Sequence, residues 1–254
     1  MVYGRLAQGM VRPSAQPPDA AHLLAEFVAP GSPYAQLEVA KKLVALKDAR
    51  VLPSLASFLT HQDRHQRGNA AFVFAGLGES RGFDVLTDML TDTSDRIRGP
   101  GIPTAPGNGI VSLDYQISAD RYYAVHLLGL LQDERAVPTL IQLMADVSIS
   151  YKVAWALGEI GGRPAVNALI AALADRDPNV RVTAIDALAR LGATEALPQL
   201  RALTGDTART NFGKQVSVGD AARAAIAKLE KRVSALAPGQ LPHHELPAGG
   251  RMEA

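Results

Sequence analysis

Four side chains in the second half of the sequence have types and spacing that could do chemistry together. Trp155 precedes Glu159 by four residues, and Asp186 precedes Arg190 by the same interval, so each pair would share one face of a helix. This is the nearest approach to a catalytic constellation in the chain. The sequence has no nucleophile elbow, phosphate-binding loop, dinucleotide glycine fingerprint or HExxH motif. We therefore assign no catalytic residue and expect a protein that is not an enzyme.

A larger set of side chains is predicted to form a binding surface. Only 5% of the residues are aromatic, yet several of the aromatic side chains occupy helix positions predicted to point away from the core. Exposed rings bordered by polar groups are typical of binding sites. The predicted binding residues are Asn69, Phe72, Arg121, Tyr122, Val125, Tyr151, Lys152, Trp155, Glu159, Asp186 and Arg190.

The predicted binding surface has two interpretations, one based on two glycines and the other on an insertion. Gly76 and Gly129 fall in the same stripe and would leave a hollow beside the rings. In the alternative interpretation, the rings pack beneath an insertion at 92–118 that folds over them. The truncation Trp155→Ala distinguishes the two: it costs mainly affinity in the first case and mainly folding stability in the second.

Charge and composition exclude several classes of site. The 254 residues include 26 Lys+Arg and 25 Asp+Glu, which leaves a formal charge of +1 and no global field to hold nucleic acid. The chain has no cysteine, so disulfides and thiolate metal sites are excluded. His126 falls in a core position, and His243 and His244 lack partner ligands at metal-site spacing. We expect no metal and no cofactor.

No segment of the sequence is apolar enough to predict membrane insertion. The first residues contain no apolar stretch of signal-peptide length, and no later segment approaches 18 consecutive apolar residues. We expect a soluble, cytoplasmic protein that makes no membrane contact.

A repeat of about 31 residues determines the predicted architecture. The hydrophobic residues that end successive helices are separated by 31, 53, 30, 31 and 38 residues, and they are Leu46, Leu77, Leu130, Ile160, Leu191 and Leu229. Each repeat predicts two helices. The first helices are expected at 19–28, 50–59, 82–90, 134–144, 164–173 and 195–203. The second helices are expected at 34–46, 66–77, 119–130, 149–160, 178–191 and 219–233.

Irregularities in this period define the expected domain organisation. The repeats form one array over 19–233, with insertions at 92–118 and 204–218 between the first and second helices of their repeats. Both insertions should therefore emerge on the same edge. Residues 1–18 are an N-terminal extension, and the tail at 234–254, rich in Pro and Gly, is expected to be disordered.

The repeat motifs resemble those of a known family. Three first helices share an apolar-Pro-x-Leu step, at 52–55, 137–140 and 197–200. One second helix begins Asp177-Pro178-Asn179-Val180-Arg181, and two end in an Ala-rich segment, at 154–161 and 187–192. These motifs resemble the short HEAT-like repeats first described in phycobilisome lyases. The resemblance covers about 19–229 and implies an all-α fold, a right-handed α-solenoid (α-α superhelix) of about six HEAT-like helical hairpins.

The resemblance is specific for the fold and leaves several functions open. HEAT-like arrays serve as scaffolds, inhibitors, chromophore-attachment factors and DNA-repair enzymes. We expect a scaffold, adaptor or immunity-type inhibitor, monomeric, that binds another protein or a peptide on its concave face. The first alternative is a lyase-like or chaperone-like factor that binds a small aromatic ligand. The second is a DNA-glycosylase-like HEAT enzyme, because Trp155 with Glu159 resembles the aromatic-plus-acid arrangement of those enzymes; the near-neutral charge makes nucleic acid unexpected.

Overall fold

The computed structural model describes residues 19–29, 31–91, 113–211 and 215–235; for 113–118 it describes the backbone alone. Within these ranges the secondary structure is helical apart from one isolated antiparallel bridge between Arg209 and Ser217. The expected N-terminal extension, most of the 92–118 insertion and nearly all of the 234–254 tail lie outside the described residues. The predicted all-α class is confirmed.

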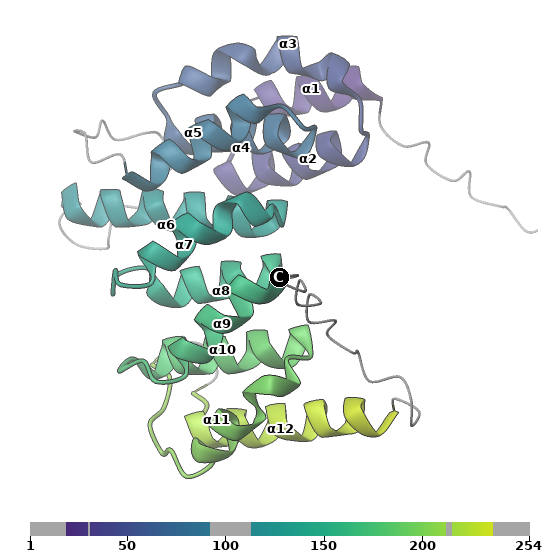
Figure 1. Cartoon of the computed structure of the whole chain (residues 1–254). Coiled ribbons are helices and arrows are strands. Elements are labelled where there is room, and N and C mark those ends of the chain that lie inside the picture. The colour runs from purple at the N-terminus through teal and green to yellow at the C-terminus, as the bar shows by residue number, and fades with distance from the viewer. Residues whose placement is uncertain (1–18, 30, 92–112, 212–214, 236–254) are drawn as a thin grey trace, which may run out of the picture.

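Six successive helical hairpins make up the described part of the chain (Figure 1). Their first helices are α1 (Ala20–Val28), α3 (Leu52–Leu55), α5 (Ser80–Thr91), α7 (Val137–Leu143), α9 (Gly162–Ala172) and α11 (Leu197–Ala202). Their second helices are α2 (Pro33–Ala45), α4 (Arg64–Gly76), α6 (Leu113–Leu131), α8 (Ser150–Ile160), α10 (Pro178–Leu191) and α12 (Val218–Ala235). The repeat period therefore predicts every hairpin, which is the solenoid architecture expected from the sequence.

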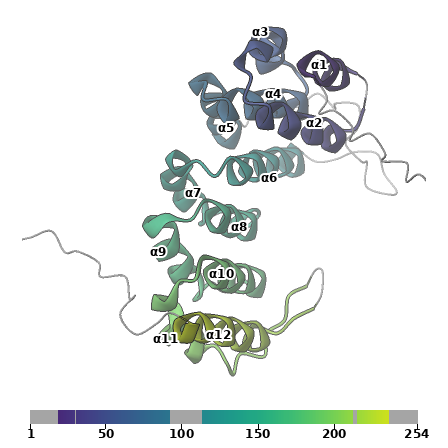
Figure 2. The same cartoon turned by 90° about the vertical axis from the view of Figure 1, so that its right-hand side faces the viewer.

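The second helices stack on one another and form one layer of the array. In Figure 2, α6, α8, α10 and α12 lie in register along one side, and α7, α9 and α11 lie along the other. The array bends at its N-terminal end, so the layer of second helices faces the inside of the bend (Figure 2). Side chains on the inner side of α6 and α8 are therefore presented near the middle of the molecule.

Local sequence explains where helices begin and end. Asp177 caps α10 by accepting a hydrogen bond from the backbone N–H of Asn179, and Pro178 occupies the first turn. Gly192 then adopts the left-handed conformation at φ 75° and ends the helix. The apolar-Pro-x-Leu step also has a structural reason, since each of the three prolines lies in the first turn of α3, α7 or α11, directly after a 3-10 turn.

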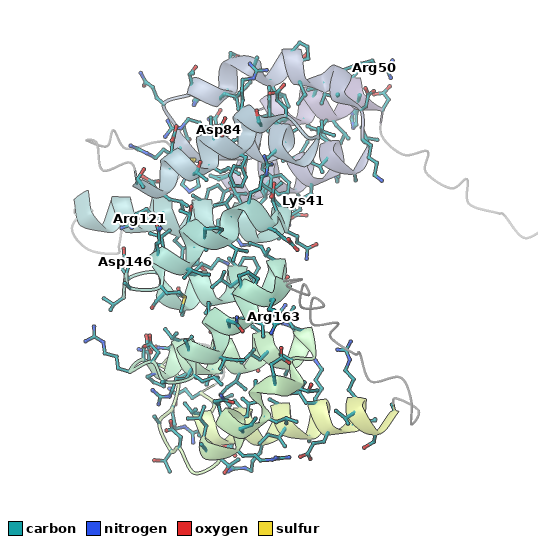
Figure 3. The ribbon with its side chains drawn as sticks, viewed as in Figure 1. Lys41, Arg50, Asp84, Arg121, Asp146 and Arg163 are labelled. Atoms are coloured by element: carbon teal, nitrogen blue, oxygen red, sulfur yellow. The ribbon has the colours of Figure 1, made fainter. Side chains whose placement is uncertain are left out.

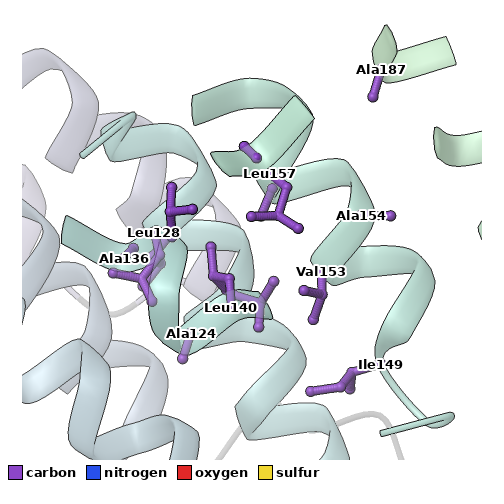
Figure 4. Packing of buried hydrophobic residues seen from close by; sticks show 14 of the residues in the cluster. Ala124, Leu128, Ala136, Leu140, Ile149, Val153, Ala154, Leu157 and Ala187 are labelled. Carbon is purple, nitrogen blue, oxygen red and sulfur yellow. The ribbon is translucent and has the colours of Figure 1, made fainter. Parts of the chain in front are cut away.

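The core lies between the two layers and is filled by small and branched apolar residues. Figure 4 shows Ala124 and Leu128 of α6, Leu140 of α7, and Val153 and Leu157 of α8 converging in one interface; all five are fully buried. Small residues occupy the closest contacts between neighbouring second helices. A Cβ added at Gly158 of α8 would lie 2.5 Å from the Cβ of Ala187 of α10.

Two segments depart from the predicted bounds. Helix α6 begins at Leu113, although the sequence places 113–118 in an insertion and starts the helix at 119. The boundary prediction was wrong there because the apolar pattern of the repeat does not extend that far, while the backbone remains helical. The described residues of the second insertion, by contrast, contact the array: the backbone N–H of Asn211 donates to Asn179 Oδ1 at 3.2 Å, and Arg181 pairs with Asp206 at 2.9 Å.

In the described residues, every helix is too short or too polar to meet the length and hydropathy that a membrane crossing requires.

Candidate functional site

The α6–α8 surface, formed by Tyr122 and His126 of α6 with Tyr151, Lys152 and Trp155 of α8, gathers rings around one ammonium group. Lys152 Nζ lies 3.5 Å from the centroid of the Trp155 ring and 5.0 Å from that of the Tyr122 ring. The centroids of Tyr122 and Tyr151 are 6.1 Å apart, and those of His126 and Trp155 are 5.0 Å apart. Tyr122, Tyr151 and Trp155 are partly exposed, so their rings form a continuous aromatic surface.

The electrostatics of this surface are set by burial. Burial lowers the pKa of Lys152 to about 8, against the opposing effect of Glu159. Burial and the ammonium groups of Lys152 and Lys41 lower the pKa of His126 to about 4. At neutral pH the imidazole is therefore uncharged, and its Nδ1 accepts a hydrogen bond from Lys152 Nζ at 2.9 Å. Burial, with the Tyr151 and Tyr34 phenols, raises the pKa of Tyr122 to about 12.

Two ion pairs border the aromatic surface. Arg121 Nη1 lies 2.6 Å from Asp146 Oδ2 beside the loop that precedes α8, and Figure 3 shows the two side chains facing each other. On the other border, Arg190 of α10 is bound to Glu159. The Glu159 carboxylate is therefore held by an arginine and is no longer a free acid beside Trp155. Because both arginines are bound to carboxylates, the surface lacks the strongly basic face needed to hold a DNA backbone.

Three predicted binding residues are buried and do not reach the surface. Phe72 is 5% exposed, and Asn69 and Val125 are fully buried, so the expectation that they lie on an exposed stripe was wrong. For Asn69 the reason is that its side chain lies between α2 and α6. Asn69 Nδ2 donates to the Pro33 carbonyl at 3.0 Å and to Gln36 Oε1 at 2.9 Å, both in α2.

The same asparagine also binds α6. Its Oδ1 accepts a hydrogen bond from the Tyr123 hydroxyl at 2.5 Å, in a fully buried position. One amide side chain on α4 thus connects helices on both sides of it, which closes the inner face of this repeat. We call Asn69, Phe72, Tyr123 and the α2 residues bound to Asn69 the α2–α4–α6 junction.

The expected hollow beside the glycines is also absent. A Cβ at Gly129 would lie 2.7 Å from Trp155 Cζ3, and one at Gly76 would lie 2.7 Å from Val44 Cγ2. Neighbouring side chains already occupy the space that each glycine leaves. The glycines allow close packing between second helices, and Gly129 in particular seats the Trp155 ring against the backbone of α6.

The remaining predicted residues lie at the C-terminal side of the surface. Asp186 is exposed on α10, one turn before Arg190. The structure therefore brings together Tyr122, Tyr151, Lys152 and Trp155, and places Arg121, Glu159 and Arg190 at the border. It buries Asn69, Phe72 and Val125. Sequence reasoning missed His126 as a member; its spacing of four residues from Tyr122 is the signal that could have found it.

No cluster of three or more His, Asp or Glu side chains at metal-binding distances occurs among the described residues. In this part of the chain the site is therefore built from aromatic and cationic groups.

Comparison with known protein families identifies the repeats. A model of HEAT repeats matches residues 20–100 and 145–211, and a model of the PBS lyase HEAT-like repeat matches 120–146. The chain belongs to the HEAT repeat family. The resemblance deduced from the sequence motifs is confirmed, and the hairpins within the matched ranges are HEAT repeats.

Two curated relatives share part of this HEAT array. The chain is 37% identical over 94 residues to the phycocyanobilin lyase subunit alpha of Picosynechococcus sp., which covers 33% of this chain and 35% of that protein. It is 30% identical over 145 residues to the bilin biosynthesis protein PecE of Mastigocladus laminosus, covering 56% of this chain and 48% of that protein. The chain spans between about a third and a half of the length of these relatives.

Solved structures with a related arrangement include an engineered protein, 18% identical with a TM-score of 0.42, covering 84% of this chain and 97% of that chain. The complex of CpcE and CpcF of phycocyanin lyase from Nostoc sp. is 17% identical with a TM-score of 0.40, covering 83% of this chain and 82% of that chain.

These relatives correct the expected function. The sequence favoured a protein- or peptide-binding scaffold, adaptor or immunity-type inhibitor, but the curated relatives are named for bilin chemistry. The motifs could not discriminate between the two, because they report the packing of a HEAT hairpin and not what its surface binds.

Proposed function

We propose that this protein is a lyase-like or chaperone-like factor that holds a bilin, a small conjugated ligand, on the α6–α8 surface. The observation that carries the proposal is a cluster of three partly exposed rings, Tyr122, Tyr151 and Trp155. The first and the last of them contact the ammonium group of Lys152. The names of the two curated relatives supply the ligand class.

The rings suit a flat conjugated ligand. Pyrrole rings stack on aromatic side chains at offset or edge-to-face geometries, and each such pair contributes about 0.5–1.5 kcal/mol beyond the area that it buries. Tyr122 and Tyr151 come from different helices, so their separation is fixed by the packing of α6 on α8. A ligand that spans both rings would therefore bind a preformed surface at little cost in conformational entropy.

The role proposed for this chain is to hold and orient the ligand. The sequence contains no cysteine, and the α6–α8 surface holds neither a metal cluster nor a free carboxylate beside the rings. The proposal accordingly assigns no covalent step to a residue of this chain. Its residues would keep the ligand extended and shield one face of it until an acceptor protein takes it.

The single tryptophan of the chain makes the test direct. Trp155 is the only Trp in the sequence and lies in the proposed site, so its fluorescence reports this surface alone. Titration with biliverdin or phycocyanobilin should quench the emission with a 1:1 stoichiometry and shift the absorption bands of the bilin. Failure of both bilins to bind at micromolar concentration would overturn the proposal.

A pair of variants tests the location. Tyr151→Ala removes one partly exposed ring and should weaken bilin binding about tenfold, as expected for loss of an aromatic anchor. Ile141→Ala is the matched control, because Ile141 is an exposed apolar residue on α7 in the outer layer. Equal binding by wild type and Tyr151→Ala would place the bilin elsewhere.

A further inference from the structure

We infer that the ligand of the α6–α8 surface carries a carboxylate, and that this carboxylate binds the ammonium group of Lys152. The inference rests on the proposed function and adds to it the polar group of the ligand and the residue that recognises it.

Lys152 is a buried cation without a carboxylate partner. The residue is 8% exposed, and the ion pairs among the described residues do not include it. Its one hydrogen bond goes to His126 Nδ1, which belongs to an uncharged imidazole at neutral pH. Buried ammonium groups in proteins are ordinarily paired, since transfer of an isolated charge from water is strongly unfavourable.

Three other cations on the second helices are each bound to a carboxylate. Lys41 Nζ lies 2.7 Å from Glu38 Oε1, Arg121 lies 2.6 Å from Asp146, and Arg190 is bound to Glu159. Glu159 is also the carboxylate that influences Lys152 electrostatically, yet it is the partner of Arg190. The described groups around the rings therefore leave one positive charge, that of Lys152, without an anion.

The aromatic rings do not compensate for the missing anion. The ammonium group lies over the Trp155 ring at 3.5 Å, and such cation–π contacts are worth about 0.5–2 kcal/mol. The lowered pKa of Lys152, with burial as its main cause, means that its surroundings as a whole disfavour the charged form. A ligand anion beside Nζ would reverse that balance.

A carboxylate fits this position better than a phosphate. One ammonium group is available, and a carboxylate brings a single negative charge together with oxygens that accept its hydrogen bonds. A phosphate monoester carries between one and two charges near neutral pH, and the excess would be buried beside the phenol of Tyr122, which cannot neutralise it. The ligand is thus expected to be a conjugated molecule with a carboxylate side arm.

The test uses pairs of probes that differ only in charge. 1-Pyrenebutyrate should bind at least tenfold more tightly than its neutral amide, measured by quenching of Trp155 fluorescence. Lys152→Met keeps most of the side-chain volume without the charge, so this variant should bind the acid and the amide with about equal affinity. Equal binding of acid and amide by the wild-type protein would overturn the inference.

A second measurement does not depend on a variant that must fold. In the wild-type protein, the pKa of Lys152, followed by NMR of labelled lysine side chains, should rise from about 8 when the protein is saturated with pyrenebutyrate. Saturation with the amide should leave it unchanged. An unchanged pKa in the presence of the bound acid would show that the carboxylate binds elsewhere and would also overturn the inference.

A bilin and its dimethyl ester separate this inference from the proposed function. Preference for the free acid supports both, and equal binding of acid and ester supports the bilin site but overturns the role of Lys152. If neither form binds while pyrenebutyrate is still preferred over its amide, the bilin proposal fails and the carboxylate site stands.

Discussion

The α2–α4–α6 junction and the α6–α8 surface are built around equivalent positions of the second and fourth repeats, but only the α6–α8 surface remains accessible. Asn69 on α4 and Lys152 on α8 fall eight residues before the last apolar residue of their helices. Asn69 is enclosed by α2 and α6 and makes hydrogen bonds to both. Lys152 lies among partly exposed rings, with a single hydrogen bond to α6. The same position of the repeat therefore stabilises the fold in one repeat and contributes to an accessible surface in another.

The difference lies in how closely the flanking helices approach. Lys41 of α2 is near enough to His126 of α6 to affect its pKa, although α4 lies between these helices in the stack. The bend at this end of the array brings α2 and α6 together over the inner face of α4. Exposure of a given repeat position thus depends on the curvature of the helix stack as well as on the residue at that position.

Truncation of an aromatic side chain is expected to give the largest difference in folding stability between the two regions. Phe72→Ala should destabilise the protein by roughly 3–5 kcal/mol, because Phe72 is buried at the junction and truncation leaves a cavity. Tyr151→Ala on the partly exposed surface should cost about 1 kcal/mol. Urea denaturation measures both. A loss below about 1 kcal/mol for Phe72→Ala would show that the junction is not packed as described.

Removal of the bridging amide sharpens the same comparison. Asn69→Ala should cost about 2–3 kcal/mol, since it leaves the buried Tyr123 hydroxyl without its acceptor. Tyr123→Phe alone should cost about 1 kcal/mol. A double-mutant cycle on the free energies of unfolding should give a clear coupling between the two residues. Additive effects would contradict the hydrogen bond.

Lowering the pH should reduce the stability of the folded protein through protonation of His126. Its pKa is about 4 in the folded protein against 6.5 for an ordinary histidine, so the unfolded chain binds more protons between these values. The stabilisation from the neutral imidazole is therefore complete above pH 6.5 and is lost as the pH falls towards 4. Because the ring is only half-buried, we expect about 1–2 kcal/mol. In His126→Gln, the free energy of unfolding should lack this part of the pH dependence.

The smallest effect is expected at the border of the surface. Arg190→Ala removes the partner of Glu159, but the arginine side chain is 42% exposed and solvent screens the pair. The loss of stability should be about 0.5 kcal/mol and should diminish further in high salt. Thermal unfolding at two ionic strengths measures it. A loss comparable with that of Asn69→Ala would mean that this border is structurally equivalent to the junction.

The sequence predicts the helical hairpins because their causes are local. Caps such as Asp177, stop signals such as Gly192 and the apolar period of each helix act within a single repeat, and the hairpins occur where these signals place them. The start of α6 at Leu113 was missed, since its first turns lie beyond the repeating pattern.

The site was predicted less completely because exposure depends on neighbouring repeats. Tyr122, Tyr151, Lys152 and Trp155 do come together, but Lys152 itself is buried, and Phe72 and Val125 belong to the core. A single sequence does not contain the distances between neighbouring helices that decide whether such a side chain is buried. The small aromatic ligand was only the first alternative, because aromatic and basic side chains suit both a peptide and a conjugated small molecule.

Gly129 gives the α6–α8 surface a property that none of its rings possesses. With no side chain at this position, α6 and α8 approach until the Trp155 ring contacts the α6 backbone, and that approach also sets the separation of Tyr122 and Tyr151. A single methyl group at residue 129 would widen the spacing between these tyrosines without changing any residue that faces the ligand. Descendants of such a protein could thus acquire selectivity for ligands of a different width through substitutions hidden between helices.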